Sequence, residues 1–159
     1  MNKLKHSALP WLFLSLCVIL IDQYSKYNAM HHLQFLNPTV INPFFNLVLN
    51  FNPGAAFSLL GFASGWQRWF FISIAFIVCI FILSWMRHTP RNHYLPSIGF
   101  ALIFGGALGN VYDRIRFGYV IDFIDWHINT WHWPTFNLAD SAICIGVGLL
   151  VIDFLVRKK

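Results

Sequence analysis

The sequence predicts an all-α membrane protein of four transmembrane helices with both termini cytoplasmic, plus a small extracytoplasmic β-structured segment. Three observations predict this class. The 159-residue chain, which we expect to form a single membrane domain over residues 1–159, is 57% hydrophobic and only 11% charged, whereas soluble domains carry roughly 25% charged residues. Four apolar runs are long enough to cross a bilayer. Lys and Arg gather in the segments that four crossings would place on one side.

The four helices follow from the apolar runs, since a helix needs roughly 20 mostly apolar residues to cross the hydrocarbon core. They are predicted at about residues 8–27, 69–86, 94–111 and 138–156. A cleaved signal peptide would also begin with basic residues such as Lys3 and Lys5. No small-residue cleavage site follows the first run, where Asp22, Gln23 and Lys26 come instead. We therefore predict that the first helix is retained.

The orientation follows from the basic residues, because cytoplasmic loops are enriched in Lys and Arg. Four crossings place seven of them on the side of the termini and leave four on the other: Lys3, Lys5, Arg87, Arg91, Arg157, Lys158 and Lys159 against Lys26, Arg68, Arg114 and Arg116. Both termini are thus predicted to be cytoplasmic. The net charge of +5 does not indicate a nucleic-acid partner, because these residues form no continuous stripe.

Two longer segments remain on the outer side, at about residues 29–67 and 112–135. The first contains Pro38, Pro43 and Pro53 together with β-prone runs such as 44–51, which is typical of a small sheet or hairpin. The second contains three tryptophans as well as His127 and His132, and we expect it to lie at the level of the lipid headgroups.

Carboxylates gather on the outer side as well. The six acidic residues are all Asp, and five fall at or near the predicted outer interface: Asp22, Asp113, Asp122, Asp125 and Asp140. An Asp at the bilayer centre costs roughly 2.5–3.5 kcal/mol on insertion scales, so ionisable residues in membrane segments are functional candidates by default. Asn110 precedes Asp113 by three residues, and Asn137 precedes Asp140 by the same interval. Each pair therefore shares one helix face.

Glycines and paired carboxylates suggest how these side chains are used. Gly105 and Gly109, four residues apart, allow another helix to approach closely. Two carboxylates about 3 Å apart share one proton, which suits general acid–base hydrolysis. Serine catalysis is disfavoured because no G-x-S-x-G elbow is present. A metal site is disfavoured because His31–His32 and the pair His127 and His132 lack the spacing of a zinc helix motif.

Five blocks, in order along nearly the whole chain, resemble the lipoprotein signal peptidases (signal peptidase II) of bacteria. They are Asp22-Gln23-Tyr24-Ser25-Lys26, Asn52-Pro53-Gly54-Ala55-Ala56-Phe57-Ser58, Gly105-Gly106-Ala107-Leu108-Gly109-Asn110-Val111-Tyr112-Asp113-Arg114, Val120-Ile121-Asp122-Phe123-Ile124 and Phe136-Asn137-Leu138-Ala139-Asp140-Ser141. The resemblance implies a multi-pass protein of the bacterial inner membrane with its active site near the extracytoplasmic face. It implies an aspartic endopeptidase that cleaves prolipoproteins before a diacylglyceryl-modified cysteine.

The resemblance also implies residue roles. Asp122 and Asp140 would be the catalytic pair. The residues that match motif positions bound to substrate or supporting the site are Asn52, Gly54, Asn110, Asp113, Arg114, Asn137, Ala139, Asp22 and Lys26. Neither a cofactor nor a metal is expected. The expected partners are diacylglyceryl-modified prolipoproteins and membrane lipid, with no nucleic acid and a monomeric enzyme.

Several alternatives stay open at this point. Asp122 and Asp140 could be solvated interfacial residues, and Asp140 could also cap the fourth helix. Asp113 is favoured as a structural partner, and Arg114 could hold a lipid phosphate or a backbone carbonyl. A small transporter or proton relay would use the same carboxylates, although a relay should cross the bilayer midplane. A non-catalytic assembly factor would use the aromatic outer segments as a binding surface.

Overall fold

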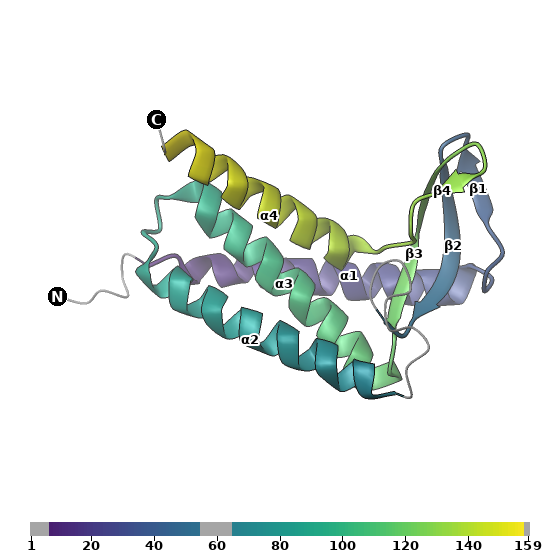
Figure 1. Ribbon diagram of the computed structural model, residues 1–159, viewed down its shortest axis with the longest axis horizontal. Helices are drawn as coiled ribbons and strands as arrows, with labels where there is room; N and C mark the ends of the chain where they lie inside the picture. The colour runs from purple at the N-terminus through teal and green to yellow at the C-terminus, as the bar shows by residue number, and fades with distance from the viewer. Residues whose placement is uncertain (1–6, 55–64, 158–159) are drawn as a thin grey trace.

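The computed structural model describes residues 7–54 and 65–157. In this part of the chain four long helices run side by side, and a four-stranded antiparallel sheet lies across one end of them (Figure 1). The elements are a short 3-10 turn η2 (Leu9–Trp11), α1 (Leu12–His32), β1 (Thr39–Asn42), β2 (Phe45–Asn52), α2 (Trp66–His88), α3 (Tyr94–Phe117), β3 (Val120–Ile128), β4 (Trp131–His132) and α4 (Leu138–Arg157).

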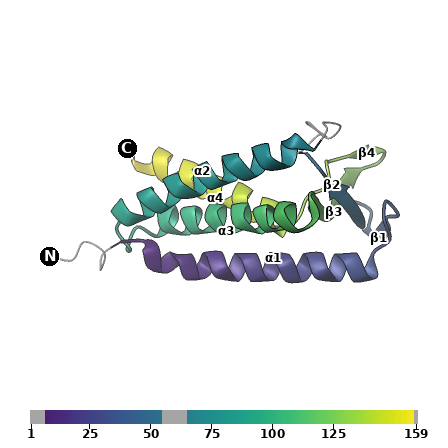
Figure 2. The same cartoon turned by 90° about the horizontal axis from the view of Figure 1, so that it is seen from below.

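Helix α3 is the central helix and packs against the other three. Figure 2 shows α1 along one side of α3 and α2 along the other. Glycines permit these contacts: a Cβ on Gly105 would lie 2.8 Å from the Ser15 carbonyl oxygen of α1, and one on Gly106 would collide with the Ala139 carbonyl oxygen of α4. The prediction that the glycine run of the third helix allows close helix approach is confirmed.

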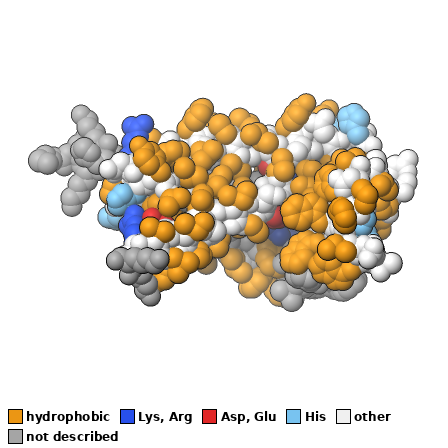
Figure 3. Space-filling model, turned by 90° about the horizontal axis from the view of Figure 1, so that it is seen from above, with side chains coloured by type: hydrophobic (Ala, Val, Ile, Leu, Met, Phe, Trp, Pro, Cys, Tyr) orange, Lys and Arg blue, Asp and Glu red, His pale blue; other side chains and the backbone are white. Residues whose placement is uncertain are grey.

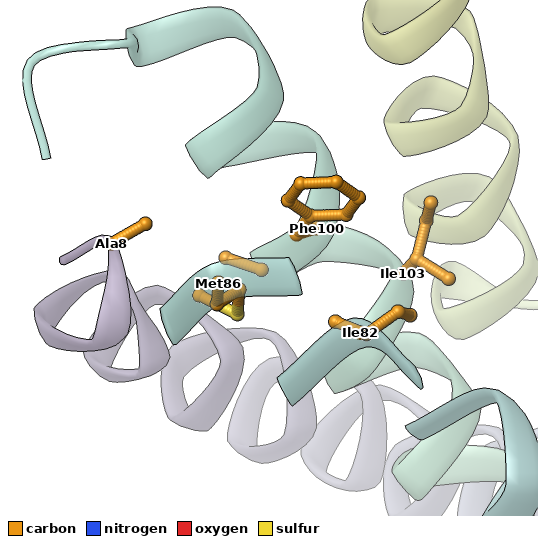
Figure 4. Packing of buried hydrophobic residues seen from close by; sticks show 6 residues of the cluster. Ala8, Ile82, Met86, Phe100 and Ile103 are labelled. Atoms are coloured by element: carbon orange, nitrogen blue, oxygen red, sulfur yellow. The ribbon is translucent and has the colours of Figure 1, made fainter. Parts of the chain in front are cut away.

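The apolar core lies at the end of the bundle that holds both termini. Ala8, Ile82, Met86, Phe100 and Ile103 are buried against one another there (Figure 4). The backbone N–H of Ala8 donates to the Met86 carbonyl at 3.0 Å, which ties the start of the chain to the end of α2. Apolar packing therefore holds this end together, and the buried charged residues belong to the opposite end.

Three helices are long and apolar enough to cross a membrane, namely α2, α3 and α4. Hydrophobic side chains cover most of the face seen in Figure 3. Helix α1 does not reach the same hydropathy in the described residues. It begins at Leu12, after Pro10, and continues to His32, past the predicted end at residue 27. Its second half contains polar residues, among them Asp22 and Lys26. Both of these side chains are buried against neighbouring elements.

The sheet draws on both outer segments. Its strand order is β1-β2-β3-β4, and β2 pairs with β3 so that Asn50 lies opposite Asp122 and Asn46 opposite Asp125. The predicted sheet is confirmed for residues 39–52, and its position on the outer side stays a prediction. The second outer segment, expected only as a stretch at headgroup level, supplies β3 and β4, which periodicity had not indicated.

Helix α3 extends to Phe117, beyond the predicted end at residue 111. Its last turn is outside the apolar run because it carries Arg114 and Arg116. The helix ends at Gly118, which has a φ of +88° and donates its N–H to the Arg114 carbonyl at 3.1 Å. Glycine adopts this left-handed conformation without steric cost. Because of this turn, β3 begins at Val120, three residues after the last residue of α3.

Candidate active site

A buried group that we call the lysine cluster, formed by Asp22, Gln23, Lys26 and Asp113, joins α1 to α3. The Lys26 Nζ lies 2.8 Å from Asp22 Oδ2 and 2.8 Å from Asp113 Oδ2, and all three side chains are at most 1% exposed. Gln23 donates to Asp113 Oδ1 at 2.8 Å. Two carboxylates thus share one buried ammonium group, which reduces the cost of burying all three charges.

The lysine cluster also holds the starts of two other elements. Asp22 Oδ1 accepts the backbone N–H of Ala139 at 2.9 Å, in the first turn of α4. Asp113 Oδ2 accepts the N–H of Ile121 at 3.3 Å, at the start of β3. Gly109 leaves room for this arrangement, because a Cβ there would lie 2.7 Å from Asp22 Oδ2. The cluster therefore positions the residues next to Asp122 and Asp140.

Asp122 and Asp140 form a second group with three amides, which we call the aspartate layer: Asn52, Asn110, Asn137, Asp122 and Asp140. Asp122 accepts from Asn137 Nδ2 at 2.8 Å and from Asn52 Nδ2 at 3.0 Å. Asp140 accepts from Asn110 Nδ2 at 2.7 Å. Each carboxyl group is thus oriented by neutral side-chain amides that come from different elements.

Asn137 also caps α4. Its Oδ1 accepts the N–H of Asp140 at 2.9 Å, and its own N–H donates to Asp140 Oδ2 at 3.3 Å. This is the reciprocal arrangement of a capping box. The interpretation of Asp140 as a helix cap and its placement beside Asp122 are therefore compatible, because Asn137 contacts the Asp140 carboxyl through its backbone N–H and the Asp122 carboxyl through its side-chain amide.

Asn110 links the two groups. Its Oδ1 accepts from Lys26 Nζ at 3.0 Å and from Asn137 Nδ2 at 3.2 Å, while its Nδ2 donates to Asp140. This bonding fixes the orientation of the Asn110 amide, since the oxygen faces the donors and the nitrogen faces the carboxylate. The position of Asp140 is thereby coupled to the lysine cluster.

Arg114 holds the strand end that carries Asn52. Its Nη2 donates to the Gly54 carbonyl at 2.9 Å, and Gly54 donates its N–H to Asn52 Oδ1 at 3.0 Å. The Asn52 oxygen is therefore occupied, which directs its NH₂ group to Asp122. Of the two roles considered for Arg114, the structure shows the contact with a backbone carbonyl.

The electrostatic environment of Asp122 favours a retained proton. Its side chain is 1% exposed, and no Lys or Arg within the described residues forms an ion pair with Asp122 or Asp140. The pKa of Asp122 is raised to about 7, first by burial in the protein and then by the neighbouring Asp140, while the amides of Asn52 and Asn137 partly oppose the shift. Carboxyl pairs with such displaced pKa values are typical of acid–base sites.

A cavity of about 730 Å³ opens beside the aspartate layer. Its polar wall contains Asn52, Asn110, Arg114 and Asp140. The remaining wall is largely apolar and comes from the sheet side and from α4: Trp126, Trp133, Phe136, Ile143, Cys144 and Ile145. Asp122 lies behind this wall and is held by Asn52. The cavity is therefore large and apolar with a few convergent polar groups, as ligand sites usually are.

All eleven residues named from the sequence lie in or next to these two groups. Asp125, which was named only as one of the outer carboxylates, lies outside both groups. It accepts a hydrogen bond from Asn46 at 2.9 Å and pairs with His132 at 2.8 Å on the sheet. Gln23 was missed as a site residue, although its place beside Asp22 in the first block was a usable signal. In residues 7–54 and 65–157 no three His, Cys, Asp or Glu side chains are grouped to hold a metal ion. Residues 55–58 of the second block lie outside the described residues.

The sequence and the fold are both similar to those of known proteins. Residues 14–156 match the family model described as signal peptidase (SPase) II. A lipoprotein signal peptidase of Coxiella burnetii (strain Dugway 5J108-111) is 53% identical over 99% of this chain and 97% of its own. One of Alteromonas mediterranea is 48% identical over 94% and 82%. A bacterial membrane enzyme solved by the in meso method at 2.3 Å has a TM-score of 0.84 at 31% identity, covering 97% of this chain and 94% of that one.

Proposed function

The chain belongs to the signal peptidase II family and cleaves the signal peptides of lipoprotein precursors, and we propose that it does so as an aspartic peptidase whose reacting groups are Asp122 and Asp140. The proposed cleavage site is the bond before a diacylglyceryl-modified cysteine. One observation carries the assignment: Asn137 contacts both carboxyl groups, Asp122 through its side-chain amide and Asp140 through its backbone N–H, beside a cavity large enough for a peptide. Among the described residues no Lys or Arg forms an ion pair with either carboxyl group.

The proposed placement is in the bacterial inner membrane, with α1 as a fourth crossing beside α2, α3 and α4. Support for α1 comes from its packing along α3 over the same length as the apolar helices (Figure 2). Arg87, Arg91 and Arg157 lie at the end of the helices that holds both termini, which favours a cytoplasmic position for that end. The sheet and the aspartate layer would then lie at the extracytoplasmic face.

In the proposed reaction Asp140 acts as the base and Asp122 as the acid. Asp140 lines the cavity, where a water molecule can reach it, and its carboxylate takes a proton from that water. The oxygen of the water forms a bond to the scissile carbonyl carbon while protonated Asp122 donates a hydrogen bond to the carbonyl oxygen. The carbon–nitrogen bond then breaks, and the nitrogen of the cysteine takes a proton from the carboxyl pair. The pair returns to its starting state with one proton.

The cavity wall suits the rest of the proposed substrate. Ile143, Cys144 and Ile145 follow Asp140 on α4 within about one and a half helical turns, so an apolar signal helix and acyl chains could lie against α4 while the bond to be cleaved reaches the carboxyls. Binding energy from these remote contacts would orient the scissile bond. The transporter hypothesis is not supported, because the carboxylates of the site occupy one end of the bundle and the comparisons identify peptidases.

The test compares wild type with Asp122→Asn and Asp140→Asn on a purified diacylglyceryl-modified prolipoprotein in detergent, read as a gel shift. Both variants should lose at least about a thousandfold in rate, because a carboxamide neither accepts the proton from water nor donates an acidic one. Asp153→Asn, at the other end of α4, is the matched control and should cleave like wild type. Wild-type rates in Asp122→Asn or Asp140→Asn would overturn the proposed roles.

A further inference from the structure

A second cavity of about 500 Å³ lies on the sheet next to the active-site cavity. We call it the outer pocket, and its lining includes Phe44, Trp126, His127, Ile128, Trp131 and Trp133. Trp126 and Trp133 line both cavities, so the two share a wall. A ligand that leaves the active-site cavity past these tryptophans would enter the outer pocket.

The strand geometry sets the distance between the two cavities. Side chains two residues apart on a strand point to the same face, so Asp122, Ile124, Trp126 and Ile128 of β3 share one face. Asp122 and Trp126 are four residues apart, which corresponds to about 13 Å along a strand. An extended peptide with its scissile bond at Asp122 would therefore bring its third to fifth residue from that bond to Trp126 and the outer pocket.

The chemistry of the outer pocket fits an uncharged peptide segment. None of the described residues that line it is Asp, Lys or Arg. The ring of His127 stacks on that of His132, with the ring centroids 5.0 Å apart. Phe44 and Trp131 offer aromatic surface to apolar side chains of a bound chain.

We propose that the outer pocket binds the mature side of the substrate, at about the third to fifth residue after the cleaved bond, and prefers uncharged, apolar side chains there. This rests on the proposed function. The residues before the bond and the acyl chains belong in the lipid beside α4, so the chain after the modified cysteine must leave in another direction. The sheet lies across the helix ends (Figure 1) and continues from the active-site cavity in such a direction.

The experiment uses two diacylglyceryl-modified prolipopeptides, one ending one residue after the modified cysteine and one carrying five further uncharged residues that include leucine. For wild type the longer substrate should have the lower KM by roughly three- to tenfold, the size expected of one or two aromatic contacts. In Trp131→Ala this advantage should largely disappear. In Trp69→Ala it should remain, because Trp69 is matched in exposure (61% against 58%) and lies on α2.

A second measurement is independent of any variant. Replacing the fourth residue after the cleaved bond by aspartate should raise the KM of wild type for the long substrate to that for the short one. Equal KM values for both substrates in wild type, or an unchanged advantage in Trp131→Ala, would overturn the proposal. A rise in KM of Trp131→Ala that is equal for both substrates and appears only in vesicles would assign the pocket to membrane lipid instead. Wild type that cleaves neither substrate would overturn the proposed function itself.

Discussion

The lysine cluster and the aspartate layer both contain two Asp side chains, yet the partners of these carboxyl groups differ. In the lysine cluster, Asp22 and Asp113 are each 2.8 Å from the Lys26 ammonium. In the aspartate layer, Asp122 and Asp140 are contacted by the amides of Asn52, Asn110 and Asn137. A cation in contact stabilises ionised carboxylates, whereas amides orient a carboxyl group without neutralising it.

This difference in partners suits the lysine cluster to a structural role and the aspartate layer to proton transfer. The carboxylates of the lysine cluster are both occupied by Lys26 and by backbone N–H groups of neighbouring elements, which suits a structural role. A buried carboxyl beside a second one holds a proton near neutral pH, as the raised pKa of Asp122, about 7, indicates. Acidic residues at a membrane face are therefore insufficient to identify a catalytic pair, and their contacts must be known.

Removing the shared cation should have the largest effect on stability. Lys26→Met leaves two buried carboxylates without a cation, and we expect a loss of about 3–5 kcal/mol in the free energy of unfolding. Denaturant unfolding of the detergent-solubilised protein, followed by tryptophan fluorescence, measures it. Arg157→Met removes a cation whose side chain is 51% exposed and serves as the control. Equal losses in the two variants would show that the lysine cluster contributes no more than a surface ion pair.

Pushing α3 and α4 apart by a substitution at their contact should have the second-largest effect on stability. In Gly106→Ala the new methyl group meets the Ala139 carbonyl of α4, and overpacking of this kind costs about 1–3 kcal/mol. Because Asp140 follows Ala139, the rate of cleavage should fall as well. Gly148→Ala is the matched control, since its Cβ would meet nothing within 4 Å. If both variants melt at the same temperature and cleave equally fast, close packing of α3 and α4 is not what positions Asp140.

The pH dependence of cleavage tests the electrostatic contrast directly. The pKa of Asp122 is raised, so its acid form is present below about pH 7 and is lost above it. The rate constant should therefore fall up to about tenfold for each pH unit above this value, as for any single required proton. Initial rates between pH 5 and pH 9 measure this, with intrinsic fluorescence confirming the fold at each pH. A rate that stays level from pH 7 to pH 9 would contradict a proton held by the pair.

The smallest effect is expected at the far end of α4. Asp153 and Arg157 form an i,i+4 pair at 3.1 Å. Exposed pairs of this kind contribute about 0.5 kcal/mol or less. Asp153→Asn should therefore change the midpoint of unfolding only marginally, measured alongside Lys26→Met in the same denaturant. A loss approaching that of Lys26→Met would remove the distinction between buried and exposed ion pairs in this protein.

The sequence by itself determined the helices, the glycine-mediated packing of α3 and the clustering of Asp and Asn at one end of the helix bundle. These follow from local quantities: hydropathy over one helix length and intervals of three or four residues. The five blocks also identified the family, and the residues that match them are the ones that the structure brings together.

Only the tertiary structure decided which carboxylate contacts which partner. Asp22, Asp113, Asp122 and Asp140 look alike in sequence, and Asp122 and Asp140 lie on different elements. Their contacts depend on the turn at Gly118, on the register of β2 against β3, and on the backbone N–H groups that Asp22 and Asp113 accept. These are long-range constraints, since the bonded atoms are up to 117 residues apart. No local pattern contains them, because the energy that selects each pairing arises only when the helices and the sheet pack together.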